Sequence, residues 1–247
     1  MKLNARLETA FELLIVAKQN AEETGASLPN TAKYARLFDV GCDHAYLSIE
    51  AVSRGLAETS FAMDVRMGPI EIARENIKRR RLEHRIQTIC TFGLDGIELL
   101  PGDAVTILGM GGLEICDIIS KVDEWPEDVI LVLQPMKSIP TVRETLRQKG
   151  LAITAERLCV QRGKLYSFIV AEPTTVVAEP DPLERAIGRH WLNHWDTDPL
   201  WPQLRDQLLN VARLRLNDPA EDHASLLAEI ARLQAMHSEP EINKTER

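Results

Sequence analysis

The sequence predicts an α/β fold with a doubly wound, mostly parallel sheet, followed by a smaller helical domain. Strand and helix signals alternate from residue 35 to about residue 171, which is the pattern of successive βαβ units. A hairpin signal closes this stretch, and beyond Pro173 only helical periodicity remains. The length of 247 residues leaves room for one sizeable domain and a second, smaller one.

The first half of the alternating region contains three predicted strands and two predicted helices. An apolar strand at residues 35–39 is followed by a helix at residues 45–54 and a second strand at residues 60–64. A proline begins the next helix, residues 69–81, because proline is favoured in the first helical turn. The third strand covers residues 85–90.

The second half contains two more parallel strands, one helix and the hairpin. The strands are predicted at residues 104–108 and 129–133, and a helix at residues 141–149 follows them. Residues 151–160 and 164–171 then form an antiparallel hairpin. In such sheets, ligands bind outside the carboxyl ends of the parallel strands.

The domain boundaries follow from the change in composition. We expect a sheet domain at residues 1–172, a linker at 173–181, a helical domain at 182–237 and a disordered tail at 238–247. The helical domain should contain helices at residues 183–195, 200–216 and 223–237. A helical hairpin would pair the apolar row Leu200, Leu204, Leu208, Val211 and Leu214 with Leu226, Leu227, Ile230 and Leu233.

Composition limits the class of protein. No apolar stretch is long enough to span a membrane, and residues 1–14 are amphipathic and contain Glu8 and Glu12, unlike a signal peptide. The four cysteines lie far apart, so we expect a reduced, cytoplasmic enzyme. His190 and His194 lack the partners of a zinc site, and no metal is predicted.

The net charge of −8 disfavours a general nucleic-acid binder but allows a local basic patch.

The most informative stretch is the run from Asp39 to Leu47, which reads Asp-Val-Gly-Cys-Asp-His-Ala-Tyr-Leu. Gly41 allows a ligand to approach the backbone, and the following helix begins with free N–H groups. A dinucleotide loop normally contains more glycine. Here Asp43 would meet the pyrophosphate, which argues against NAD. A ligand that carries positive charge, such as S-adenosylmethionine (SAM), fits better.

Two further acids and a glycine run follow later strands. Asp64 ends the second strand, where an acid can accept hydrogen bonds from both ribose hydroxyls of a nucleoside. Asp95 could accept from an adenine amino group, or it could simply be a turn aspartate. The run Gly109-Met-Gly-Gly112 lets a flat base or a cofactor approach closely, although it could be an ordinary turn. The Asn-Pro-Pro-aromatic run of many DNA amino-methyltransferases is absent here.

Several residues have more than one interpretation. Asp43 could cap the following helix, or its carboxylate could lie between the methyl donor and the acceptor base. His44 is more often structural than catalytic, and Tyr46 could either stack on a base or belong to the core. The dense basic run Lys78-Arg-Arg-Arg81 could be a solvated helix face or a strip that contacts phosphates.

Taken together, these segments resemble one family, the bacterial tRNA adenine-22 N1-methyltransferases, which are SAM-dependent. The matching segments are Arg6-Leu7-Glu8, the run from Asp39 to Leu47, Asp64-Val65-Arg-Met-Gly-Pro69, Asp95-Gly96, Gly109-Met-Gly-Gly112, Leu133-Gln-Pro-Met136 and Gly163-Lys164-Leu-Tyr166. Their order and spacing carry the resemblance, which extends more weakly through the helical region.

The resemblance implies a Rossmann-like class I SAM-dependent methyltransferase domain with a C-terminal helical, coiled-coil-like domain. It implies SAM contacts at Asp39, Gly41, Asp64, Asp95 and the Gly109 loop, with Asp43 as a catalytic candidate. Our candidate cofactor contacts also include Cys42, His44, Val65, Gly96, Met110 and Gly111. Tyr46 is the second catalytic candidate, and the candidate RNA contacts are Lys78, Arg79, Arg80 and Arg81.

The expected reaction is methyl transfer from SAM to N1 of an adenine in tRNA. N1 has a free lone pair, so no proton must leave before attack, and positioning is most of the catalytic work. Asp43 would accept from the N6 amino group, while Tyr46 or Met110 would pack on the base. The alternatives are a SAM-binding RNA-interaction module without transfer, or a methyltransferase for ribosomal RNA or a small molecule. A dehydrogenase is disfavoured, and the oligomeric state is not predicted.

Overall fold

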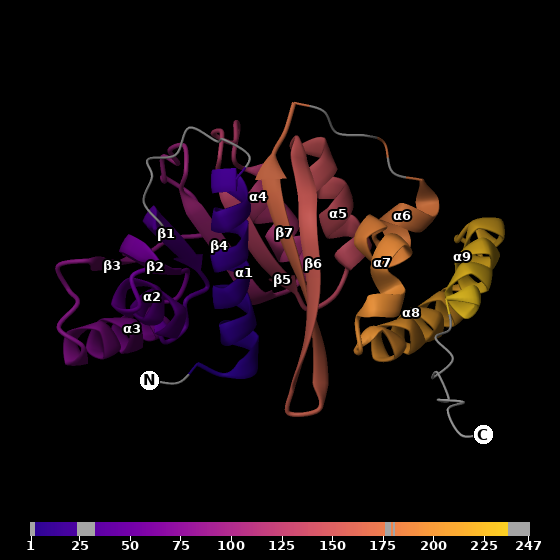
Figure 1. Cartoon of the computed structure of the whole chain (residues 1–247), viewed down its shortest axis with the longest axis horizontal. Helices are drawn as coiled ribbons and strands as arrows, with labels where there is room; N and C mark the ends of the chain where they lie inside the picture. The colour runs from indigo at the N-terminus through magenta and orange to yellow at the C-terminus, as the bar shows by residue number, and fades with distance from the viewer. Residues whose placement is uncertain (1–2, 24–32, 176–178, 180, 237–247) are drawn as a thin grey trace, which may run out of the picture. The chain divides into compact units, whose positions relative to one another are not determined.

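The computed structural model describes residues 3–23, 33–175, 179 and 181–236 of the chain (Figure 1). Contacts divide the chain into two compact units, Met1–Glu179 and Pro180–Arg247. The expected tail, residues 238–247, and four positions of the expected linker lie outside the described residues. The domain boundaries expected from composition therefore stay a proposal.

The first unit contains a seven-stranded sheet. Its strands are β1 (Tyr34–Val40), β2 (Ala57–Asp64), β3 (Ile86–Cys90), β4 (Ala104–Met110), β5 (Ile130–Pro135), β6 (Leu151–Gln161) and β7 (Lys164–Pro173). They lie in the order β3-β2-β1-β4-β5-β7-β6. Strands β1 to β5 are parallel, and β7 inserts antiparallel between β5 and β6. The strand order reverses beside β1, so the carboxyl ends of β1 and β4 form the expected ligand crevice.

Helices cover both faces of this sheet (Figure 1). They are α1 (Ala5–Glu23), α2 (Tyr46–Ser53), α3 (Met67–Arg79), α4 (Gly112–Ser120) and α5 (Ile139–Gln148). One apolar layer joins Phe11 and Leu14 of α1 to Leu37 of β1. On the opposite face, Phe38 belongs to the layer that includes Ile115 of α4. Neighbouring β1 residues thus face opposite cores, as expected for a strand buried on both sides.

The second unit is helical in its described part. It contains α6 (Pro182–Ile187), α7 (Arg189–His194), α8 (Trp201–Arg215) and α9 (His223–Ala235), with a short 3-10 turn at Trp195–Thr197. The single helix predicted for residues 183–195 is wrong. It is broken at Gly188, whose φ of 100° is incompatible with a continuous helix.

The predicted apolar rows of α8 and α9 are also partly wrong. Val211, Leu214 and Leu227 are exposed. The buried residues of the two helices include Trp201, Leu204, Ala212, Leu226 and Leu233. Trp201 fixes the orientation of α8, because its ring is buried and its indole N–H donates to the carbonyl oxygen of Met236 at 2.9 Å. A helix that buries this ring turns Val211 and Leu214 toward solvent.

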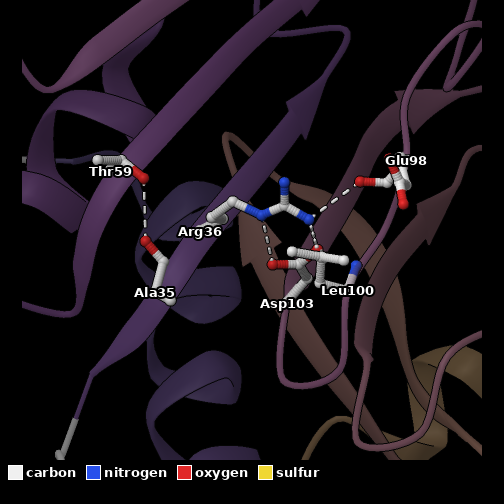
Figure 2. A network of polar contacts seen from close by, with 6 residues as sticks. All are labelled: Ala35, Arg36, Thr59, Glu98, Leu100 and Asp103. Atoms are coloured by element: carbon white, nitrogen blue, oxygen red, sulfur yellow. Dashed lines mark hydrogen bonds and ion pairs between the residues drawn. The ribbon is translucent and has the colours of Figure 1, made fainter.

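A polar network fastens the loop that precedes β4 to the start of β1 (Figure 2). Arg36 donates from Nε to Oδ1 of Asp103 at 2.8 Å and from Nη2 to the carbonyl of Glu98 at 3.0 Å. The backbone N–H of Leu100 donates to Oδ2 of Asp103 at 2.7 Å. Asp103 is buried. This network lies at the amino ends of the strands, opposite the ligand crevice.

Candidate active site

A cavity of about 630 Å³ lies at the carboxyl ends of the central parallel strands. Its lining comes from the loops after β1, β2, β3 and β4 and from the start of α1 and α4. The lining residues are Arg6, Val40, Gly41, Asp43, Asp64, Val65, Arg66, Thr91, Phe92, Gly93, Leu108, Gly109, Met110, Gly111, Glu114 and Ile118. The size is that of a typical small-molecule site.

The loop after β1 forms one wall of the cavity. Gly41 has φ of +75°, in the left-handed region that favours glycine, and a Cβ there would displace the end of the Met110 side chain. Asp43 and Ala45 also have positive φ, of 50° and 55°. Asp43 does not cap the next helix: the residue that precedes α2 is Ala45, and in the first turn of α2 the backbone N–H of Ser48 donates to the carboxylate of Asp39 instead. Its carboxylate is 67% exposed and lines the cavity.

Asp39 lies beneath this loop, not in the lining. It is 4% exposed and accepts hydrogen bonds from Ser48 Oγ at 2.8 Å and Thr106 Oγ1 at 3.1 Å. Burial raises the pKa of its carboxyl group, and the two hydroxyl donors oppose this shift only in part. Asp39 therefore supports the β1 loop from inside the protein.

The raised pKa of Asp39 predicts how stability depends on pH. The folded state binds the Asp39 proton more tightly than the unfolded chain, whose carboxyl pKa is near 3.8. The contribution of Asp39 to stability is therefore largest at acid pH and falls as pH rises through the folded-state pKa. We expect Asp39→Asn to remove this fall. Urea unfolding from pH 4 to pH 8 measures it, and a difference between the two proteins that is constant with pH contradicts the expectation.

Asp64 ends β2 and is part of the lining, as the sequence predicts. Its Oδ1 accepts from the backbone N–H of Arg66 at 2.9 Å and from Arg66 Nε at 3.4 Å. No described residue donates to Oδ2, which leaves that oxygen for a ligand. The predicted neighbour Val65 also lines the cavity and is exposed.

The loop after β3 contributes different residues from those predicted. Thr91, Phe92 and Gly93 line the cavity, whereas the predicted Asp95 and Gly96 do not. The carboxylate of Asp95 lies 3.5 Å from Lys121 Nζ in an exposed ion pair. The loop that the sequence singled out therefore does line the cavity, but Asp95 on it pairs with Lys121, and the predicted cofactor contacts at Asp95 and Gly96 stay predictions.

The loop after β4 meets an unexpected cation from α1. Gly109, Met110 and Gly111 line the cavity as predicted. Arg6 joins them, and its Nη1 donates to Oε1 of the buried Gln134 at 3.2 Å. A Cβ on Gly109 would lie 2.4 Å from the same Nη1. Sequence reasoning gave Arg6 no role, although it is part of the Arg-Leu-Glu segment that carried the family resemblance.

Three further candidates lie beside the cavity and outside its lining. Cys42 is buried, and burial together with the nearby aspartates raises the pKa of its thiol. The ring of His44 lies 5.2 Å from that of Tyr46, and its Nε2 is 3.4 Å from Oδ2 of Asp43. Tyr46 packs against the core beneath α1. The placement of His44 and Tyr46 is that of supports for the Asp43 loop.

The structure does not bring the basic run Lys78–Arg81 to the cavity. Its four side chains are exposed, and Arg79 pairs with Glu75 at 3.2 Å. Helix α3 begins beside Asp64 and has 13 residues, so its far end lies roughly 18 Å from its start. A role of this run in RNA binding stays a prediction.

Comparison with known proteins identifies the family. The family model described as tRNA (adenine(22)-N(1))-methyltransferase matches residues 37–241. The chain belongs to this family. A curated member from Bacillus subtilis strain 168, named tRNA (adenine(22)-N(1))-methyltransferase, is 32% identical over 189 residues, which cover 76% of this chain and 72% of that protein.

Solved structures of similar proteins agree with the fold. A tRNA methyltransferase from B. subtilis has a TM-score of 0.75 at 23% identity and covers 95% of this chain and 98% of its own. A Streptococcus pneumoniae protein in complex with S-adenosyl-L-methionine has a TM-score of 0.70 at 25% identity, over 91% and 98% of the two chains. The predicted fold class, SAM dependence and membership of this methyltransferase family are confirmed.

Two other observations concern only the part of the chain that the structure describes. No cluster of three or more histidine, cysteine, aspartate or glutamate side chains there could hold a metal ion. None of the described helices combines the length and the apolar character needed to cross a lipid bilayer.

Proposed function

We propose that this tRNA (adenine(22)-N(1))-methyltransferase family member uses the cavity at the ends of β1, β2 and β4 to methylate N1 of an adenine in tRNA. The observation that carries the proposal is the cavity lining, in which three carboxylates, Asp43, Asp64 and Glu114, share one space with the glycines of three loops. The family membership supplies the reaction class, and the cytoplasm is where such an enzyme would meet its tRNA.

The lining fits S-adenosylmethionine. Gly41 and Gly109 have no side chains of their own, which lets Met110 and the guanidinium of Arg6 lie close against the two cavity loops. Asp64 has an oxygen available for ribose hydroxyls. Phe92 and Ile118 give the cavity wall apolar residues against which an adenine can pack. When bound, SAM supplies an electrophilic methyl group on a sulfonium, and the cavity carboxylates favour that positive charge.

Arg6 is suited to hold the single anionic group of the cofactor, its α-carboxylate. The cavity has two cationic side chains, and Arg66 is already bonded to Asp64 at the ribose end. Arg6 lies at the opposite side, over Gly109 and against Gln134. With the ribose at Asp64, the amino-acid part of SAM extends toward Arg6, where a guanidinium can bind the carboxylate.

Arg6→Gln should therefore weaken SAM and S-adenosylhomocysteine binding about tenfold, as expected for loss of a charge-assisted hydrogen bond. Binding of 5′-methylthioadenosine, which has no carboxylate, should be unchanged. Calorimetry with the three ligands measures the difference. Arg66→Gln is the matched control, since it lies at the ribose end and should not discriminate between ligands with and without the carboxylate. An equal loss for all three ligands in Arg6→Gln would remove Arg6 from this role.

Asp43 is the residue that we assign to the acceptor base. Its exposed carboxylate stands on the β1 loop and lines the cavity near Met110 and Gly111. A carboxylate there can accept from the N6 amino group of adenine and stabilise the positive charge that N1 methylation leaves on the ring. N1 lies on the Watson–Crick edge, so the nucleotide must be unpaired before it enters.

Mass spectrometry of nucleosides tests the proposed reaction directly. Purified protein, SAM and a tRNA transcript should yield 1-methyladenosine, and a transcript with guanine in place of the adenine at position 22 should yield none. Methylation of that control transcript would place the target elsewhere. Saturable SAM and tRNA binding without any methylated nucleoside would favour the binding-module alternative.

A further inference from the structure

The turn between β6 and β7 projects beyond the neighbouring strands of the sheet (Figure 1). Leu133 of β5 lies opposite Ile169 of β7. Strand β5 ends two residues later, at Pro135, whereas β7 begins five residues before Ile169, at Lys164. Because the strands are antiparallel, the hairpin extends about 10 Å past the carboxyl end of β5. It therefore stands at the edge of the sheet where the cavity lies.

Hydrogen bonding connects this turn to the cavity wall. The backbone N–H of Arg6 donates to Oε1 of Gln161 at 3.0 Å, and the guanidinium of the same residue lines the cavity. Tyr166 lies between two cations: its ring centroid is 6.0 Å from Cζ of Arg6 and 5.5 Å from Nζ of Lys164. Arg6 thus connects the two: its side chain lines the cavity, and the same residue contacts Gln161 and Tyr166 of the hairpin.

The hairpin tip, which we define as residues 161–166, is basic and contains no acid. Arg162 and Lys164 are exposed, and neither forms an ion pair with another described residue. Lys137 adds a third exposed cation near the cavity, since its Cε lies 3.7 Å from the Cβ position of Gly111. Positive charge at this place is unusual in a chain of net charge −8. The charge of the hairpin tip is opposite to that of the carboxylates that line the cavity.

We infer that the hairpin tip binds tRNA phosphates beside the nucleotide that enters the cavity. The inference rests on the proposed function and names the surface that holds its substrate. Exposed arginine and lysine bind phosphates without regard to sequence. The tRNA must be held close to the cavity for one of its bases to enter it. The tip suits this role because it is basic, projects outward and is hydrogen-bonded to the cavity wall. The run Lys78–Arg81 has more cations, but it lies at the far end of α3.

Two matched charge reversals separate these surfaces. Arg162→Glu with Lys164→Glu changes the tip, and Lys78→Glu with Arg80→Glu makes the same change of charge at the far end of α3. The tip variant should bind tRNA at least about tenfold more weakly at 0.1 M salt, with a slope of log affinity against log salt lower by about two. The α3 variant should stay close to wild type. Arg162→Lys with Lys164→Arg should retain wild-type affinity.

Filter binding over a salt series measures tRNA affinity, and steady-state kinetics should show a higher KM for tRNA in the tip variant with kcat retained at saturation. SAM affinity by calorimetry should equal wild type in every variant, which shows that the folded site persists. Wild-type tRNA affinity in the tip variant, or an equal or larger loss in the α3 variant, overturns the inference. Absence of methyl transfer by the wild-type protein instead overturns the proposed function, so the two failures are distinguishable.

Discussion

Asp43→Asn is expected to lower kcat for tRNA methylation about 100-fold or more, with little change in SAM affinity. The carboxylate lines the cavity, and no helix N-terminus uses it. The ring gains positive charge as N1 is methylated, so a negative oxygen at its N6 amino group stabilises the transition state more than the ground state. An amide keeps the shape of the side chain and loses that charge.

Asparagine is the substitution of choice because of the backbone at this position. Asp43 has φ of 50°, in the left-handed region that asparagine tolerates better than alanine. A defect in Asp43→Asn therefore reports on charge and not on the loop. Single-turnover methylation at saturating tRNA and SAM measures the chemical step, and calorimetry measures SAM affinity.

Glu114→Gln is the matched control for the Asp43 substitution. Glu114 is exposed in the first turn of α4 and lines the same cavity. The variant therefore also removes one negative charge from the cavity lining. Turnover close to wild type is expected, because Glu114 has no assigned role at the base. If Asp43→Asn also turns over near the wild-type rate, Asp43 has no part in the chemistry and acts only in the loop.

Much of the fold could be predicted because its signals are local. The acids and glycines that end β1, β2 and β4 follow short apolar runs, and those runs are strands in the structure. The strand ends of a doubly wound sheet meet at one edge. Gly41, Asp43, Asp64 and Gly109 therefore lie together in one cavity although 68 residues separate the first from the last.

The rest of the site depends on contacts that no local pattern encodes. Arg6 reaches the β4 loop only because α1 packs across β5, β6 and β7. On the loop after β3 the sequence predicts a contact at Asp95, whereas Thr91, Phe92 and Gly93 line the cavity and Asp95 pairs with Lys121. In the second unit, apolar periodicity selected Val211 and Leu214, whereas burial of the larger Trp201 sets the orientation of α8. In α8, tertiary packing overrides periodicity.

We expect the edge of the sheet opposite the cavity to affect the stability of the first unit more than its activity. Asp103 is 2% exposed at its side chain and accepts from Arg36, which is 25% exposed, and from the N–H of Leu100 (Figure 2). Replacing the carboxylate by an amide leaves the partly buried guanidinium without its counter-charge and leaves one acceptor oxygen for the donors of Arg36 and Leu100. Removing one partner of a buried pair is costly for this reason.

Asp103→Asn is therefore expected to lower the free energy of unfolding by about 3 kcal/mol. For a unit of this size, that corresponds to a fall in Tm of about 6–10 °C. Glu75→Gln is the matched control, since it breaks the Glu75–Arg79 pair, whose side chains are 71% and 72% exposed. Exposed pairs contribute less than about 1 kcal/mol. Urea unfolding and calorimetric melting compare the two variants with wild type.

The position of Asp103 makes the result specific. Because the network lies at the amino ends of the strands, Asp103→Asn should bind SAM with wild-type affinity at temperatures where it is folded. Arg36→Met in the same chain removes the cation left without its partner and should recover part of the lost stability. Equal melting of Asp103→Asn and Glu75→Gln would mean that water replaces the lost carboxylate, and that the loop before β4 is held by its backbone hydrogen bonds alone.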